Sequence, residues 1–258
     1  MPIAGGIHYI LHQGGRSTKP PLVLIHGAGG DHLSWPPEIR RQADARVFSL
    51  DLPGHGKSEG PGRQSVADYA DSMVGFMNAA GLARAVFVGH ALGGAIALTL
   101  AIDHPECVAG IGLISSGPRI PIASSVLENA VNPATFNLAV QSLEELMHIP
   151  QDAKYLKDLI HKHLSSIRPT LFHGDLRACD RFDVTTCLDA IRTPVLVLCG
   201  TEDQLTPRRY SESLAVQIPG AALQTIDGAG HLVMLEQPRR VSALLSVFLA
   251  VIPDFPGM

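Results

Sequence analysis

The 258-residue sequence lacks the features that mark membrane-spanning, secreted or nucleic-acid-binding proteins. Its richest apolar run, residues 241–252, is shorter than the ~20 residues of a membrane-spanning helix and fits a buried C-terminal helix. Lysine and arginine number 20 against 24 acidic residues and form no basic patch. The first residues show no charged segment followed by an apolar one, so we expect no signal peptide and a cytoplasmic location. Neither a membrane nor a nucleic acid is expected as a partner.

Cysteine is scarce, and its four members show no C-x-x-C spacing: Cys107, Cys179, Cys187 and Cys199. We therefore expect free thiols that are buried as small hydrophobic residues in a reducing compartment. Histidine is more abundant, with 12 residues. However, His161, His163 and His173 fall in a polar helical stretch without metal-ligand spacing. We predict no metal and no cofactor.

The hydrophobic content of 46% is enough for one large α/β domain. Apolar runs bounded by turn residues alternate with helical patterns, which is typical of a mostly parallel sheet covered by helices on both faces. We predict strands at residues 7–11, 21–26, 46–51, 85–89, 111–115, 194–199 and 222–226. Helices are predicted at residues 65–81, with Ser65 as the N-cap, and at 92–104, 207–217 and 237–251.

Residues 118–190 break this alternation. They show no strand signal but four helix-like stretches, at 124–131, 135–148, 152–166 and 171–178. A helical insertion between two strands is expected to form a lid over the carboxyl ends of the sheet, where open α/β sheets bind ligands. We therefore predict a core domain of residues 1–117 and 191–258, with a helical cap of residues 118–190.

The segment Gly89-His90-Ala91-Leu92-Gly93 joins a clear strand to a clear helix. Glycines two residues before and after position 91 permit a strained, crowded turn, which projects the central side chain above the sheet at a helix N-terminus. This spacing is that of a nucleophile elbow, G-x-S-x-G. Position 91, where the elbow carries its serine, is alanine.

The chain resembles the α/β-hydrolase superfamily over nearly its whole length. Besides the elbow, the resemblance rests on the loops at residues 26–30 (His-Gly-Ala-Gly-Gly), 51–58, 200–207 and 228–231. The order of elbow, acid loop and histidine loop is also that of the superfamily. The resemblance implies the α/β-hydrolase fold and a carboxylesterase-type hydrolase that acts on small to medium acyl esters.

The same resemblance implies a catalytic base at His231, with Asp203 as the acid that orients it and stabilises its imidazolium. Two other acids compete with Asp203 for this role. Glu202 is its direct neighbour and would point elsewhere, while Asp227 lies too near His231 along the chain to reach its ring. The implied oxyanion donors are the backbone N–H groups of Ala28 and Leu92.

Alanine at position 91 can neither attack a carbonyl nor form an acyl-enzyme, and three interpretations follow. In the first, a Ser→Ala replacement has disabled a Ser-His-Asp esterase. In the second, the alanine is natural, as in superfamily members that resemble aminoacrylate hydrolases and carry Gly-His-Ala-Leu-Gly at the elbow. In the second case the His231–Asp203 pair would activate water. In the third, the chain is a ligand-binding pseudohydrolase. The expected partner is a small-molecule ester or its acyl product, bound by a monomer or homodimer.

Overall fold

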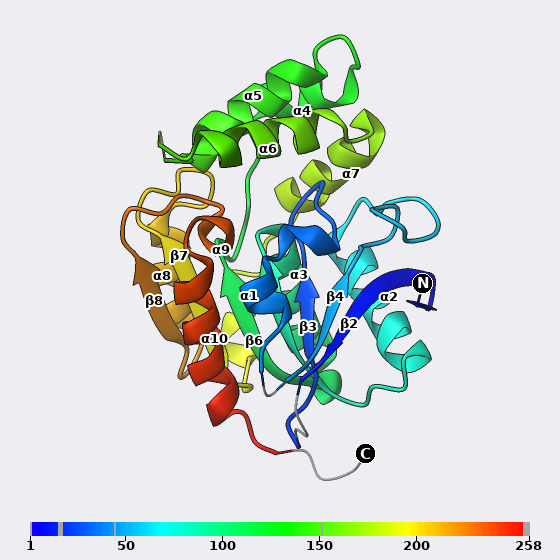
Figure 1. Ribbon diagram of the computed structural model, residues 1–258, viewed down its shortest axis with the longest axis vertical. Helices are drawn as coiled ribbons and strands as arrows, with labels where there is room; N and C mark the ends of the chain where they lie inside the picture. The colour runs from blue at the N-terminus through cyan, green and yellow to red at the C-terminus, as the bar shows by residue number, and fades with distance from the viewer. Residues whose placement is uncertain (1, 15–17, 44, 151, 255–258) are drawn as a thin grey trace.

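The structure is a computed structural model that describes residues 2–14, 18–43, 45–150 and 152–254. Within these residues, eight strands form one sheet in the order β1-β2-β4-β3-β5-β6-β7-β8 (Figure 1). The strands β1 and β2 run antiparallel to their neighbours, and the others are parallel. The strand bounds are β1 Ile3–Ala4, β2 Ile7–Gln13, β3 Leu22–Ile25, β4 Arg46–Leu50, β5 Ala85–His90, β6 Val108–Ile114, β7 Val195–Gly200 and β8 Ala222–Ile226.

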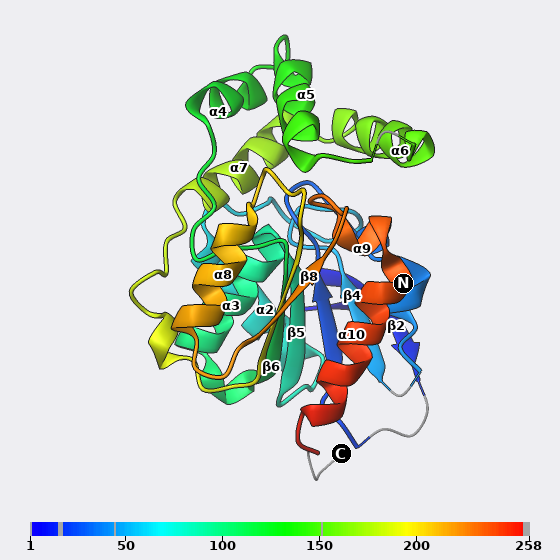
Figure 2. The ribbon, with the colours of Figure 1, turned by 90° about the vertical axis from the view of Figure 1, so that its left-hand side faces the viewer.

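Helices cover both faces of the sheet (Figure 2). The helices outside residues 118–190 are α1 Pro37–Arg40, α2 Val66–Ala79, α3 Leu92–Asp103, α8 Arg208–Gln217, α9 Val233–Glu236 and α10 Pro238–Val251. In β3, Val23 and Ile25 belong to the apolar layer under α2, α3 and α8, whereas Leu22 and Leu24 belong to the layer under α1 and α10. A strand buried on both faces is apolar at every position. The predicted mostly parallel sheet with helices on both faces is confirmed.

Four helices follow β6 and lie together above the carboxyl ends of the strands (Figures 1 and 2): α4 Ser124–Val131, α5 Phe136–Met147, α6 Lys154–Ser165 and α7 Pro169–Asp180. We call residues 118–190 the helical segment. Many of its buried apolar side chains, among them Val140, Leu143 and Phe172, continue the layer of α10, whereas Ala178, Cys179 and Phe182 belong to the layer of α2 and α3. The helices therefore lie over the edge of the sheet where a ligand was expected. The division into a core domain and a cap stays a prediction.

Several details differ from the expectations. The two-residue strand β1 and the four-residue helices α1 and α9 are too short to leave a periodic pattern. Helix α10 is amphipathic, because Val247 and Val251 are exposed while its inner face is buried. All four cysteines are free, but Cys187 is exposed. No helix in the described part of the chain is long and apolar enough to cross a membrane.

The predicted N-cap of α2 is confirmed, because the Ser65 hydroxyl accepts a hydrogen bond from the Asp68 backbone N–H at 3.1 Å. We expect Ser65→Ala to lower the free energy of unfolding by about 1 kcal/mol, since one N–H of the first turn loses its acceptor. Urea denaturation measures this change. The control is Asn78→Ala on the exposed face of the same helix, and equal losses in both variants would contradict the capping role.

Candidate active site

The turn at Ala91 joins β5 to α3 and has the strained geometry of a nucleophile elbow. Ala91 adopts φ 48° and ψ −109°, a conformation that costs a non-glycine residue about 1–3 kcal/mol. A Cβ on Gly93 would lie 2.1 Å from the carbonyl oxygen of Ile25, so only glycine lets α3 approach β3 this closely. The chain thus keeps the backbone that presents a nucleophile, with a methyl group in its place.

His231 and Asp203 come together from the loops after β8 and β7. His231 Nδ1 lies 2.9 Å from Asp203 Oδ2, and both side chains are almost completely buried. Burial alone would raise the pKa of Asp203, but the His231 ring and the hydrogen bonds on the carboxylate lower it below its ordinary value. The carboxylate is therefore ionised and accepts the Nδ1 proton. In this tautomer the lone pair lies on Nε2 of His231, as the predicted role of this residue requires.

Thr206 supplies further hydrogen bonds to Asp203. Its hydroxyl donates to Asp203 Oδ2 at 2.7 Å and lies 3.2 Å from His231 Nδ1. The backbone N–H groups of Leu205 and Thr206 donate to Asp203 Oδ1 at 2.9 and 2.8 Å. These contacts fix the plane of the carboxylate and, through it, the orientation of the imidazole.

The helical segment contacts both of these loops through the last turn of α5. The carbonyl of Met147 accepts the N–H of His231 at 2.8 Å, and the carbonyl of Leu146 accepts the N–H of Gln204 at 3.2 Å. The last carbonyls of a helix have no partner within it, so they are ready acceptors. The position of His231 therefore depends on the helical segment as well as on the sheet.

The loop after β3 places Ala28 opposite the elbow, where Ala28, Ala91, Leu92 and His231 line one cavity. Leu92 opens α3, so its N–H has no partner within the helix. Behind the loop, His26 Nε2 accepts the N–H of Leu52 at 3.0 Å, and its Nδ1 donates to the Gly27 carbonyl at 2.7 Å. Burial lowers the pKa of His26 to about 4, so this ring is a neutral support. The sequence-predicted site residues thus meet at one place, while the oxyanion role of Ala28 and Leu92 stays a prediction.

The cavity has a volume of about 270 Å³ and extends between the sheet and the helical segment. Its lining includes Leu33 and Leu159, which are 59% and 47% exposed. Apolar side chains make up most of the lining: Leu33, Ile120, Ile122, Leu143, Met147, Leu159, Ile160, Leu164, Phe172, Leu176, Leu205, Leu232, Met234 and Leu235. Such a lining favours an uncharged, apolar ligand of modest size.

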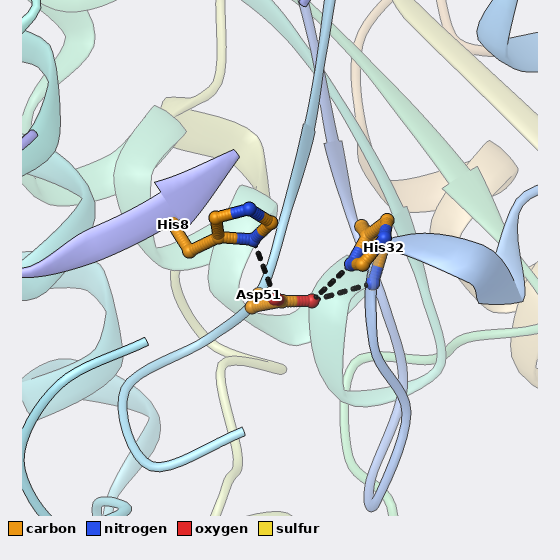
Figure 3. Close-up of side chains that lie close together, drawn as sticks. All are labelled: His8, His32 and Asp51. Carbon is orange, nitrogen blue, oxygen red and sulfur yellow. Dashed lines mark hydrogen bonds and ion pairs between the residues drawn. The ribbon is translucent and has the colours of Figure 1, made fainter. Parts of the chain in front are cut away.

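One other group of side chains has the composition of a metal site. Within the described residues, only His8, His32 and Asp51 bring three ligand atoms close enough together (Figure 3). Asp51 Oδ2 lies 2.7 Å from His8 Nδ1, and Oδ1 lies 2.8 Å from His32 Nδ1. The same two oxygens also accept the backbone N–H groups of Lys57 and His32. Burial alone would raise the pKa of Asp51, but these hydrogen bonds lower it. With four donors on one carboxylate, the cluster fits a hydrogen-bonded junction better than a metal site.

Two residues that contact the predicted site, Thr206 and Asp175, were not predicted from the sequence. Thr206 follows Asp203 in an Asp-x-x-Thr turn, and this spacing was a usable signal. Asp175 is completely buried beside the loop of Ala28. The sequence offers one signal for Asp175. Phe172, Leu176 and Cys179 form an apolar stripe at helical spacing, and Asp175 places a carboxylate within this stripe.

Comparisons with known proteins agree with this fold. The family described as alpha/beta hydrolase fold matches residues 20–238. A Caulobacter vibrioides protein, provisionally named carbamate hydrolase RutD, is 29% identical over 95% of each chain. The 2-hydroxymuconate semialdehyde hydrolase of Pseudomonas putida is 31% identical over 96% of this chain and 92% of its own. A thermophilic esterase from Thermogutta terrifontis superimposes with a TM-score of 0.83 and 26% identity, over 95% of this chain and 93% of its own. The chain therefore belongs to the α/β-hydrolase fold family.

Proposed function

We propose that this site hydrolyses uncharged carboxylic esters with small to medium acyl groups. Because Ala91 excludes the covalent route of a serine esterase, the His231–Asp203 pair acts on water instead. The observation that carries this proposal is the buried, hydrogen-bonded His231–Asp203 pair, which shares an apolar cavity with Ala91. A protein that only binds a ligand needs no such oriented base.

The chemistry requires one proton transfer in each direction. His231 Nε2 removes a proton from water, and the oxygen of that water attacks the acyl carbonyl carbon. The N–H groups of Ala28 and Leu92 donate to the carbonyl oxygen as negative charge develops on it. The intermediate then collapses, the bond to the alcohol oxygen breaks, and the imidazolium of His231 returns the proton to that oxygen. Asp203 stabilises the imidazolium throughout.

The cavity supports the choice of substrate. A volume of about 270 Å³ suits a short or medium acyl chain, and the aliphatic lining rewards its burial. Asp31 also lines the cavity, and its negative charge would repel an anionic substrate. An uncharged ester is therefore a better substrate for this cavity than an ester that carries a negative charge.

Carbamate hydrolysis is the second candidate, and the name of the Caulobacter vibrioides relative favours it. An uncharged carbamate ester presents the same kind of carbonyl to the same water. Parallel assays with matched p-nitrophenyl esters and p-nitrophenyl carbamates separate the two, because whichever bond the site is built for will show the higher kcat/KM.

The direct test is His231→Ala. We expect at least a ~100-fold fall in the rate of p-nitrophenyl butyrate hydrolysis, because water then lacks its base. The control is His161→Ala, which removes an exposed histidine of α6 and should leave the rate unchanged. If His231→Ala hydrolyses the ester as fast as the unsubstituted protein, the proposal fails. Ligand binding that survives this change, without turnover in any variant, would indicate a receptor.

A further inference from the structure

The helical segment holds the loop of Ala28 at the next residue, Gly29. Asp175 Oδ2 of α7 accepts the Gly29 N–H at 2.8 Å, and His163 Nε2 of α6 donates to the Gly29 carbonyl at 2.9 Å. The backbone of Gly29 has φ +66°, and a Cβ there would lie 2.4 Å from Ile167 Cδ1. Both polar backbone groups of Gly29 are therefore bonded to helices that lie far along the chain.

The Asp175 carboxylate is itself held by two further side chains, Tyr69 and His55. The Tyr69 hydroxyl of α2 donates to Asp175 Oδ1 at 2.5 Å, and His55 Nε2 lies 2.8 Å from Oδ2. Burial raises the pKa of Tyr69, and the Asp175 carboxylate raises it further. Burial would lower the pKa of His55, but Asp175 more than offsets this and raises it. The side chain of Asp175 is thus a buried carboxylate held at three points.

The geometry of this contact reaches the oxyanion loop directly. The Gly29 N–H belongs to the peptide plane that follows Ala28, so fixing this plane fixes the rotation about the Ala28 backbone. On the other side, Gly30 N–H donates to the Gly27 carbonyl at 3.1 Å and closes a tight turn around Ala28. With both sides held, the direction of the Ala28 N–H is determined.

We infer that Asp175 is a positioning residue for the oxyanion hole: it holds the Gly29 N–H so that the Ala28 N–H points at the reacting carbonyl, with His163 holding the Gly29 carbonyl. This inference rests on the proposed function for its kinetic consequence, although the contact itself does not. It makes seating of the helical segment a condition for catalysis, because the same contacts that seat α6 and α7 also aim the donor.

The kinetic test compares three variants. Asp175→Ala should lower kcat for p-nitrophenyl butyrate about 10- to 100-fold with little change in KM, because a misaimed donor affects the transition state more than substrate binding. Asp175→Asn keeps an oxygen for the Gly29 N–H and should recover most of the rate. His173→Ala removes another side chain of α7 and leaves both hydrogen bonds of Gly29 in place, so it should keep kcat. Equal kcat losses in Asp175→Ala and His173→Ala would overturn the inference.

Amide hydrogen exchange of residues 26–30 gives a readout that needs no activity. Exchange should be at least ~10-fold faster in Asp175→Ala than in His173→Ala, since only the first removes the acceptor of the Gly29 N–H. If no variant hydrolyses any ester, the proposed function fails and exchange alone decides the positioning role. Should Asp175→Ala not fold, His163→Ala replaces it, because this half-buried side chain supplies the second contact to Gly29. Unchanged exchange in the folded variant would overturn the inference.

Discussion

Replacing Ala91 with serine is expected to raise the rate of ester hydrolysis by about three orders of magnitude or more. Loss of the serine from a Ser-His-Asp triad costs about 10⁶ in turnover, whereas the oxyanion hole and binding site alone retain about 10³ over water. Three features of the structure would support a serine at position 91. The backbone has the elbow conformation, His231 is oriented by Asp203, and α3 begins at the next residue.

The physical reason for this large gain is the change of nucleophile. A water molecule must be captured and oriented at each turnover, whereas a hydroxyl at position 91 is held there by the strained turn. Its proton would pass to His231 Nε2, and its developing charge would benefit from the N-terminus of α3. A methyl group and a hydroxymethyl group differ by one oxygen, so the fold should accept the change.

The measurement is steady-state hydrolysis of short and medium p-nitrophenyl esters, with a pre-steady-state burst as the sign of an acyl-enzyme. The double variant Ala91→Ser with His231→Ala is the matched control and should lose the gain. Equal, low rates for Ala91→Ser and the unsubstituted protein would show that the site is not a serine-esterase site lacking its nucleophile. A slower Ala91→Ser variant would instead favour a site adapted to water, in which the hydroxyl occupies the place of the nucleophile.

The parts of this site that sequence reasoning reached share one property: they lie in short motifs at strand ends. Parallel strands bring their carboxyl ends to one edge, so the elbow of Ala91, the loop of Asp203 and the loop of His231 must meet there. Local spacing was enough to name these residues, and the structure brings them together. Their catalytic roles remain predictions that the substitutions test.

The parts that sequence reasoning missed depend on how separate elements pack. The Asp175–Gly29 contact joins residues 146 positions apart and exists only because α7 rests on the loop after β3. No local pattern shows which loop a buried carboxylate will meet. The cavity volume likewise depends on where α4–α7 sit over the sheet, and the exposure of Cys187 depends on the course of the chain after α7. Such features follow from tertiary packing rather than from periodicity or motif spacing.

Acid is expected to destabilise this protein well above the range in which its carboxylates titrate, by up to about 5 kcal/mol between pH 7 and pH 4.5. The cause is two buried, neutral histidines. Burial lowers the pKa of His26 to about 4 and that of His90 to about 3. In the unfolded chain both have the ordinary value of about 6.5.

The direction follows from proton binding. Below pH 6.5 the two histidines bind protons in the unfolded chain but not in the folded protein. The free energy of unfolding is therefore highest above this pH, and it falls as the pH approaches the pKa values of the folded protein. Each histidine contributes about 1.4 kcal/mol per pH unit in that window. Asp203 and Asp51, whose pKa values are lowered, lose their contributions only below about pH 4. His55, whose pKa is raised, keeps its contribution throughout the window, and Glu236, whose pKa burial raises, acts in the opposite direction.

Urea denaturation at several pH values between 7 and 4.5 measures how steeply the free energy of unfolding falls with pH. The variant His90→Gln shows how much of this slope comes from His90. The imidazole of His90 lies beside the ring of His231, and its Nε2 donates to the His231 carbonyl at 3.1 Å. The amide of glutamine can donate to the same carbonyl but does not titrate, so this variant should lose about half of the slope. His161→Gln, at an exposed histidine, should leave the slope as it is. If His90→Gln has the full slope of the unsubstituted protein, protonation of His90 is not what acid unfolding requires, and the neutral ring beside His231 has no part in the acid sensitivity of the fold.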